Sequence, residues 1–214
     1  MSDINLAQIF FAFLVLLFSL TVHEMAHAWT ADRLGDPTAR LLGRVSLNPI
    51  VHADLIGTII FPLIAMVSGV PLIGWAKPVP VNPRQLGHPR RDYVLVAAAG
   101  PASNLLMAIG AAVLLRFLPV SPVTIGEPNV SVPIASLLGQ AMRLNVLLAV
   151  FNMVPIPPLD GGNVLSGLLP RRIGYQYNAI VRPYGFLLIY ALMLSRGFEY
   201  LVIPPSRLLI SWLQ

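Results

Sequence analysis

The amino-acid sequence predicts an all-α polytopic membrane protein with about five to six membrane segments. Its 214 residues are 56% hydrophobic and only 11% charged, and the mean hydropathy is +0.75. Soluble domains are about one-quarter charged. The apolar residues fall in long runs and the charged residues gather at the ends of these runs, which is typical of helices that cross a lipid bilayer.

We expect one integral-membrane domain over residues 1–214, because no internal repeat, low-complexity tract or interdomain linker interrupts the sequence. Its core would be residues 4–169, followed by C-terminal membrane segments within residues 174–214. The absence of cysteine excludes disulfides and thiolate metal sites. The net charge of +5 comes from basic residues at segment ends rather than on one face, so we expect no nucleic-acid partner.

The first membrane segment is the uncharged run of residues 4–22, which is long enough to span the bilayer as a helix. Residues 26–28 imitate a signal-peptidase site. However, the first three residues lack the basic charge with which signal peptides begin. We therefore expect a retained membrane helix rather than a cleaved leader.

Residues 55–76 form a second apolar segment, which glycine and proline interrupt and which has basic residues on both flanks. Basic flanks favour the cytosolic side, so one full crossing would leave one of them outside. A re-entrant or interfacial element is expected instead. In residues 75–82, valines and prolines alternate, which favours either a short edge β-strand that could accept an unfolded peptide or a stiff connector.

Three further regions complete the predicted fold. Residues 93–115 form an uninterrupted span that is rich in small residues suited to close helix packing. Residues 134–159 form a span that ends in a proline-rich break. Residues 184–195 and 198–212 provide one or two C-terminal membrane segments.

A metal-binding pattern closes the first segment, where residues 23–27 read His-Glu-Met-Ala-His. On a helix, His23 and His27 are four residues apart, so both imidazoles project from one face and can hold one Zn²⁺. Glu24 is placed to act as a general base that takes a proton from the attacking water. Ionisable residues inside a membrane segment indicate a functional site.

A catalytic zinc site needs a third protein ligand and an open position. Asp160 stands out among the nine acidic residues because it follows the proline-rich break in an apolar context. Irregular backbone at membrane depth is tolerated only where it lines protein or a water-filled cavity. The carboxylate is either a metal ligand or the N-cap of a short helix over residues 163–169. Beside a site that lacks its third ligand, we favour the ligand.

Three other polar side chains are candidates for the site. Asn104, in a Gly-Pro-x-x-Asn pattern, either donates a hydrogen bond to a substrate carbonyl or oxyanion, or bonds a neighbouring helix. Asn152 has the same two interpretations. His52 could assist the metal site or stabilise an oxyanion, or it could be an ordinary loop histidine with local partners.

Together, the patterns at residues 23–27, 100–104 and 152–161 resemble the site-2 protease family of intramembrane zinc metalloproteases, peptidase family M50. They occur in the family's order and cover nearly the whole chain from residue 10 to residue 169. The chain resembles the short members of the family, which lack a PDZ-type domain.

This resemblance implies one Zn²⁺ per chain and a defined set of site residues. The set consists of His23, His27 and Asp160 as metal ligands, Glu24 as general base, and Asn104 and Asn152 on the substrate peptide. The implied reaction is hydrolysis of peptide bonds in or near transmembrane segments, with single-span membrane proteins or membrane peptides as substrates and the lipid bilayer as the surroundings. The alternative is a membrane metal-binding or transport protein without hydrolysis, which would have no need of Glu24.

The charge distribution predicts that the site faces the cytosol. The three patterns meet at one depth if the first helix runs inward, the helix over residues 93–115 runs outward and the segment over residues 134–159 runs inward. The loop over residues 119–132 has no Lys or Arg, as expected outside the cell. The residues then placed inside are Arg33, Arg40, Arg44, Lys77, Arg84, Arg90, Arg91, Arg171 and Arg172.

Overall fold

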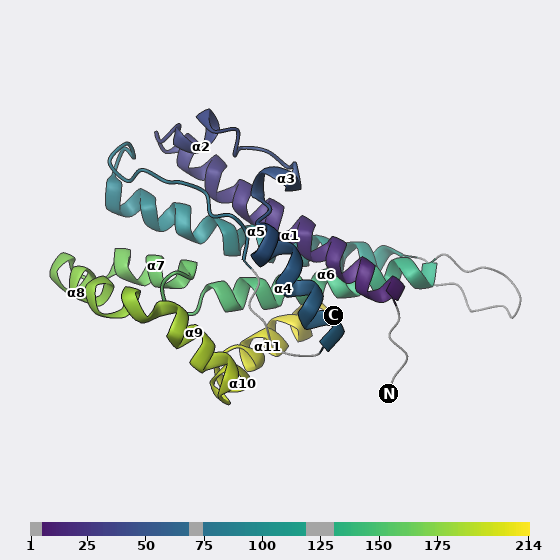
Figure 1. Ribbon diagram of the computed structural model, residues 1–214. Coiled ribbons are helices and arrows are strands. Elements are labelled where there is room, and N and C mark those ends of the chain that lie inside the picture. Colours follow the sequence, from purple (N-terminus) through teal and green to yellow (C-terminus); the bar gives the residue numbers. More distant parts are fainter. Residues whose placement is uncertain (1–5, 69–74, 119–130) are drawn as a thin grey trace, which may run out of the picture.

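A computed structural model of the chain describes residues 6–68, 75–118 and 131–214. The described residues form helices and turns and contain no β-strand, which confirms the all-α prediction (Figure 1). The elements are α1 (Leu6–Arg33), α2 (Thr38–Leu41), α3 (Pro49–His52), the π-helix η1 (Leu55–Ile60), α4 (Phe61–Ser68), α5 (Pro89–Phe117), α6 (Ser131–Asn152), α7 (Asp160–Leu168), α8 (Arg171–Val181), the 3₁₀-helix η2 (Arg182–Tyr184), α9 (Gly185–Leu194), α10 (Gly197–Leu201) and α11 (Ile203–Leu213).

Four helical stretches are long and apolar enough to cross a membrane, so the chain is an integral membrane protein. They are Ile9–Arg33, Pro89–Phe117, Val132–Asn152 and Arg171–Leu194. The last one starts well before the predicted C-terminal segment, because α8 continues through η2 into α9. The third ends at Asn152, since the prolines that follow cannot continue a helix.

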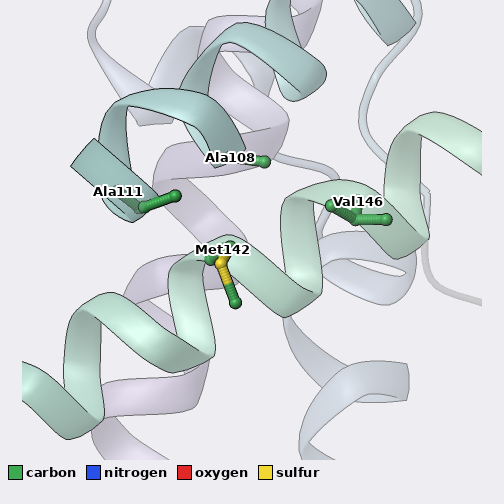
Figure 2. Close-up of a cluster of buried hydrophobic side chains, with 5 residues drawn as sticks. Ala108, Ala111, Met142 and Val146 are labelled. Carbon is green, nitrogen blue, oxygen red and sulfur yellow. The ribbon is translucent and has the colours of Figure 1, made fainter. Parts of the chain in front are cut away.

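The helices α1, α5 and α6 form the central bundle, in which α5 runs opposite to the other two (Figure 1). Small side chains on α5 let α6 pack closely against it. Ala108 and Ala111 lie against Met142 and Val146 of α6, and all four are buried (Figure 2). Without a hydrophobic force between helices inside a bilayer, such close van der Waals packing is what holds them together.

The helical segment that follows α3, formed by η1 and α4, is too short to cross the membrane, which agrees with a re-entrant or interfacial element. The helices η1 and α4 have six and eight residues, about 21 Å in total, whereas the hydrocarbon core is about 30 Å thick. Asp54 caps η1 by accepting hydrogen bonds from the backbone N–H groups of Ile56 and Gly57. The remainder of the predicted element, residues 69–74, lies outside the described residues.

The edge β-strand expected over residues 75–82 is not confirmed, because this segment has no strand pairing in the part of the chain that the structure describes. Its two prolines remove N–H donors at alternate positions. The remaining donors that are bonded find partners outside any sheet, two of them on α3 and α1. The N–H of Lys77 donates to the His52 carbonyl, 2.8 Å away, and the N–H of Val79 donates to the Glu24 carboxylate, 3.2 Å away. The segment is therefore an anchored connector, which we call the 75–82 connector.

The C-terminal helices return to the end of α6. Leu192 of α9 and Val202, between α10 and α11, are buried against Val154, which follows α6. A Cβ atom built at Gly185, the first residue of α9, would overlap the carbonyl of Pro157. Glycine at this position therefore lets α9 start directly on the proline-rich break.

If residues 55–76 do not cross the membrane, single cysteines on their two flanks will be labelled from the same side. The chain has no cysteine of its own, so Leu47→Cys and Arg84→Cys each provide one reporter. We expect an impermeant maleimide to reach both from the same face of sealed vesicles. Thr124→Cys, in the connection between α5 and α6, should react only from the opposite face. Labelling of Leu47→Cys and Arg84→Cys from opposite faces would show a full crossing.

Candidate metal centre

Three side chains from two distant parts of the sequence meet at one point beside α5. His23 and His27 lie on one face of α1, both are buried, and their Nε2 atoms are 3.1 Å apart. The Asp160 carboxylate at the start of α7 completes the group. Its Oδ2 atom lies 3.2 Å from His23 Nε2, and its Oδ1 atom lies 3.4 Å from His27 Nε2. The structure thus places together the three ligands that the sequence predicts.

These separations fit a zinc ion. In a tetrahedral site with Zn–N and Zn–O bonds of about 2.0–2.1 Å, neighbouring ligand atoms are about 3.3–3.4 Å apart. Two nitrogens and one carboxylate are a usual ligand set of catalytic zinc and leave one coordination position for water or substrate. The donor set and its spacing therefore suit a catalytic rather than a closed structural site.

Asp160 is oriented toward the histidines rather than toward the helix it begins. The helix α7 starts at Asp160 itself, three residues earlier than predicted, and its N-cap residue is Leu159. Burial alone would raise the pKa of the Asp160 carboxyl group, but the imidazoles of His27 and His23 outweigh burial and hold this pKa below its ordinary value. A lowered pKa favours the ionised form, which a metal ligand must have.

A tight turn returns the chain from α6 to the metal group. Two consecutive glycines make this turn possible at the start of α7. A Cβ atom at Gly161 would overlap the Met153 carbonyl group, and one at Gly162 would overlap the backbone of Pro157. The Asp-Gly-Gly sequence therefore combines a ligand with the two residues that let its helix approach the break.

Both histidines are held by the nitrogen that does not face the ligand cluster. Nδ1 of His23 lies 2.6 Å from Asn104 Oδ1, and Nδ1 of His27 lies 2.7 Å from the Val96 carbonyl oxygen. Both partners are acceptors, which assigns the proton to Nδ1 in each ring and leaves Nε2 free to bind metal. Such bonds fix ring orientation and raise the basicity of the ligands.

The hydrogen bond to His23 continues into a buried polar network across three helices. Nδ2 of Asn104 donates to Asn145 Oδ1 over 2.8 Å, and Nδ2 of Asn145 donates to Ser19 Oγ over 2.9 Å. All four side chains are at most 5% exposed. The sequence analysis missed Asn145 and Ser19. Its position inside a predicted membrane segment was the only sign of Asn145 in the sequence, and α6 carries other polar residues as well.

This network bears on the predicted substrate role of Asn104. Its oxygen is engaged by His23 and its nitrogen by Asn145, so both ends of the amide are occupied. The geometry favours a positioning role, and the substrate role stays a prediction.

The glycine of the Gly-Pro-x-x-Asn pattern, Gly100, has a packing role beside the two histidines. It is buried on α5, where a Cβ atom would overlap Nε2 of His27 and the ring of His23. Asn104 follows one turn later and reaches the far side of the His23 ring. The glycine gives α5 its approach to the imidazoles, and the asparagine fixes one of them.

The three other predicted site residues are not among the ligand cluster and have hydrogen-bond partners of their own. Glu24 is half-buried on α1 and its Oε2 atom accepts the hydrogen bond from Val79. Asn152, at the end of α6, is half-buried and donates from Nδ2 to the Leu148 carbonyl, 3.0 Å away. His52 is buried at the end of α3 and its Nε2 lies 2.9 Å from the carbonyl oxygen of Ser46. Their catalytic roles stay predictions.

Fold and site define the class as a helical integral membrane protein with a His-Glu-x-x-His zinc site completed by an aspartate. Residues 11–195 match the family model of peptidase family M50, and the chain belongs to this family. It is a zinc metalloprotease.

Curated relatives agree with this assignment. "Putative zinc metalloprotease YwhC" of Bacillus subtilis is 36% identical over 191 residues, which cover 89% of this chain and 83% of that protein. "Putative zinc metalloprotease Rip2" of Mycolicibacterium smegmatis is 29% identical over 180 residues, which cover 84% of this chain but 64% of that protein. No solved structure matches the chain.

The close approach at Gly100 can be tested with a single methyl group. Gly100→Ala should displace the imidazoles and lower zinc affinity by at least tenfold, although alanine favours a helix more than glycine does. Gly110→Ala is the matched control. Gly110 lies on the same helix, α5, and a Cβ atom there would have no neighbour within 4 Å. Zinc content and dissociation constants of the purified variants measure the effect. Equal zinc affinity of the two variants would contradict the packing described here.

The polar network makes a second prediction. Asn145→Leu removes the acceptor of Asn104 and should lower zinc affinity about 10- to 100-fold, as loss of a ligand's supporting hydrogen bonds typically does. Val146→Ala alters the next residue, which is fully buried but outside the network, and should leave zinc affinity unchanged. Competition with a chelator gives the two affinities. A similar loss in both variants would assign the effect to packing rather than to the network.

Proposed function

We propose that the chain is an intramembrane endopeptidase that cuts single-span membrane proteins or membrane peptides in or near their transmembrane segments, as in regulated intramembrane proteolysis. The observation that carries this proposal is the location of the metal group. His23 and His27 lie within one candidate membrane span, and Asn104, which bonds His23, lies within another. A metal site built from membrane helices suits a substrate that is itself in the bilayer.

In the proposed reaction, the chain's residues move one proton and hold the reacting groups. When bound, Zn²⁺ supplies a Lewis acid that polarises the scissile carbonyl and acidifies water. Glu24 takes the proton from the attacking water and delivers it to the leaving amine nitrogen. Asn152 is half-buried at the end of α6, and turning its amide away from Leu148 would let it donate to the oxyanion.

The substrate helix must unwind locally, because a helical backbone hides its carbonyl groups from attack. We propose that the opened peptide extends along the 75–82 connector, whose Val79 N–H lies 3.2 Å from the Glu24 carboxylate. This contact supports the proposal by placing a stiff segment beside the general base. Main-chain pairing along such a segment would hold a peptide largely independently of its side chains.

We also propose that the site faces the cytosol. Arg33 ends α1 after the two histidines, and Arg90 lies at the start of α5, before Gly100 and Asn104. Basic residues next to membrane segments favour the cytosolic side. Water would then reach the site from the cytosol.

The general-base role is tested by removing the charge of Glu24 while keeping its shape. Glu24→Gln should retain zinc, since it leaves all three ligands in place, but should abolish cleavage of a co-expressed single-span substrate. Glu199→Gln, an exposed acidic residue of α10, is the control and should cleave normally. Zinc content and product bands on an immunoblot report the two effects separately. Cleavage by Glu24→Gln at the wild-type rate would contradict the assignment.

A further inference from the structure

A second pocket lies between the start of α5 and the junction of α7 with α8, apart from the metal group. It has a volume of about 640 Å³. Its walls are apolar and include Val94 and Leu95 of α5 and Leu168 of α7. Leu95 is 45% exposed and Leu168 is 70% exposed, so the apolar walls are accessible from outside the protein.

Four arginines lie in, or directly next to, the two chain segments that line this pocket. Arg90 and Arg91 line it, and Arg171 and Arg172 directly follow Pro170, another lining residue. None of the four forms an ion pair with a carboxylate in the described parts of the chain. The nearest acidic residue in sequence, Asp92, is buried and accepts a hydrogen bond from the His88 N–H. The positive charge of the four arginines is therefore not neutralised by these residues.

The pocket lies at the membrane boundary. The helices α5 and α8 begin the candidate spans Pro89–Phe117 and Arg171–Leu194, and both begin beside the pocket, which Arg90 and Pro170 line. The arginines thus lie where two membrane helices meet water, whichever way the protein is oriented. The N-terminal ends of both helices also direct their positive dipole ends to this point.

We propose that this pocket binds one anionic phospholipid. The arginines receive its phosphate through bidentate, charge-assisted hydrogen bonds, and an acyl chain lies against Val94, Leu95 and Leu168. Charge complementarity selects this occupant: basic pockets between membrane helices attract anionic headgroups, and a second copy of the chain would bring like charges together. The apolar walls select a lipid over a free phosphate ion, which would leave them uncovered.

A lipid held here would also stabilise the metal group, because the pocket joins two of the helices that form it. Nε of Arg90 donates to the carbonyl of Gly167, 2.8 Å away, and a Cβ atom at Gly167 would overlap Val94. This contact ties α5 to α7, and α7 begins with Asp160. A phosphate that bridges the arginines of α5 and α8 would strengthen the same connection. The binding itself does not depend on the proposed proteolysis.

The test uses the purified full chain in a neutral detergent, with lipid binding measured by native mass spectrometry. Phosphatidylglycerol and phosphatidylcholine with identical acyl chains are compared, and inorganic phosphate is added as a competitor. We expect one phosphatidylglycerol bound at least tenfold more tightly than phosphatidylcholine, with no displacement by millimolar phosphate. Equal binding of the two lipids would show an apolar surface only, and displacement by phosphate would show an anion site; either result overturns the proposal.

Paired variants locate the binding. Each arginine near an anionic lipid contributes about fivefold in affinity, so Arg91→Gln with Arg171→Gln should weaken phosphatidylglycerol binding by at least tenfold. Arg116→Gln with Arg207→Gln removes two exposed arginines outside the pocket and should leave phosphatidylglycerol binding unchanged. Zinc content confirms that both double variants are folded. Arg172→Gln provides a second, milder variant, with an expected loss of about fivefold. Unchanged binding in the pocket variants would overturn the proposal.

Discussion

The structure depends on how closely α5 approaches the two histidines of α1. At Gly100 the backbone of α5 occupies the place where a side chain would overlap both imidazoles. This approach brings Asn104 onto His23 and the Val96 carbonyl onto His27, so one helix fixes both rings by their Nδ1 atoms. Because both Nε2 atoms are then directed to one side, a single carboxylate on α7 is sufficient to complete the ligand set.

Polar side chains inside the bundle follow from the same geometry. An imidazole bonded to an asparagine leaves the amide nitrogen of that asparagine to be satisfied, and an unpaired buried donor costs about 1–3 kcal/mol. Asn104 therefore requires an acceptor, which Asn145 of α6 provides, and Asn145 in turn bonds Ser19 of α1. The network closes on the helix from which it started. It ties the three central helices together with hydrogen bonds, while alanines and larger apolar residues pack them farther along.

The sequence predicted the parts of this site that short patterns determine, and missed those that depend on three-dimensional packing. The four-residue spacing of His23 and His27 places them on one helix face wherever that helix lies. Asp160 could be found because a proline-rich break makes a carboxylate at membrane depth conspicuous. Asn145 has no such local pattern, and its role becomes visible only when α6 is seen beside Asn104. The edge strand was not confirmed, for a related reason. Alternating valine and proline favour extended backbone, but pairing needs a neighbouring strand, and the described residues supply helices and turns there.

The third ligand is positioned by backbone contacts rather than by a large apolar core. The helix α7 has nine residues, too few to be stable by itself in water. Glycines hold it at both ends: Gly161 lies against the chain leaving α6, and Gly167 lies against Val94 of α5. Such contacts have little tolerance, since an added methyl group meets backbone or a branched side chain that cannot move aside. The position of Asp160 is consequently coupled to both the proline-rich break and the start of α5. Any ligand that strengthens the contact at Gly167 therefore acts on the metal site, because α7 is short enough to transmit the constraint over two turns of helix.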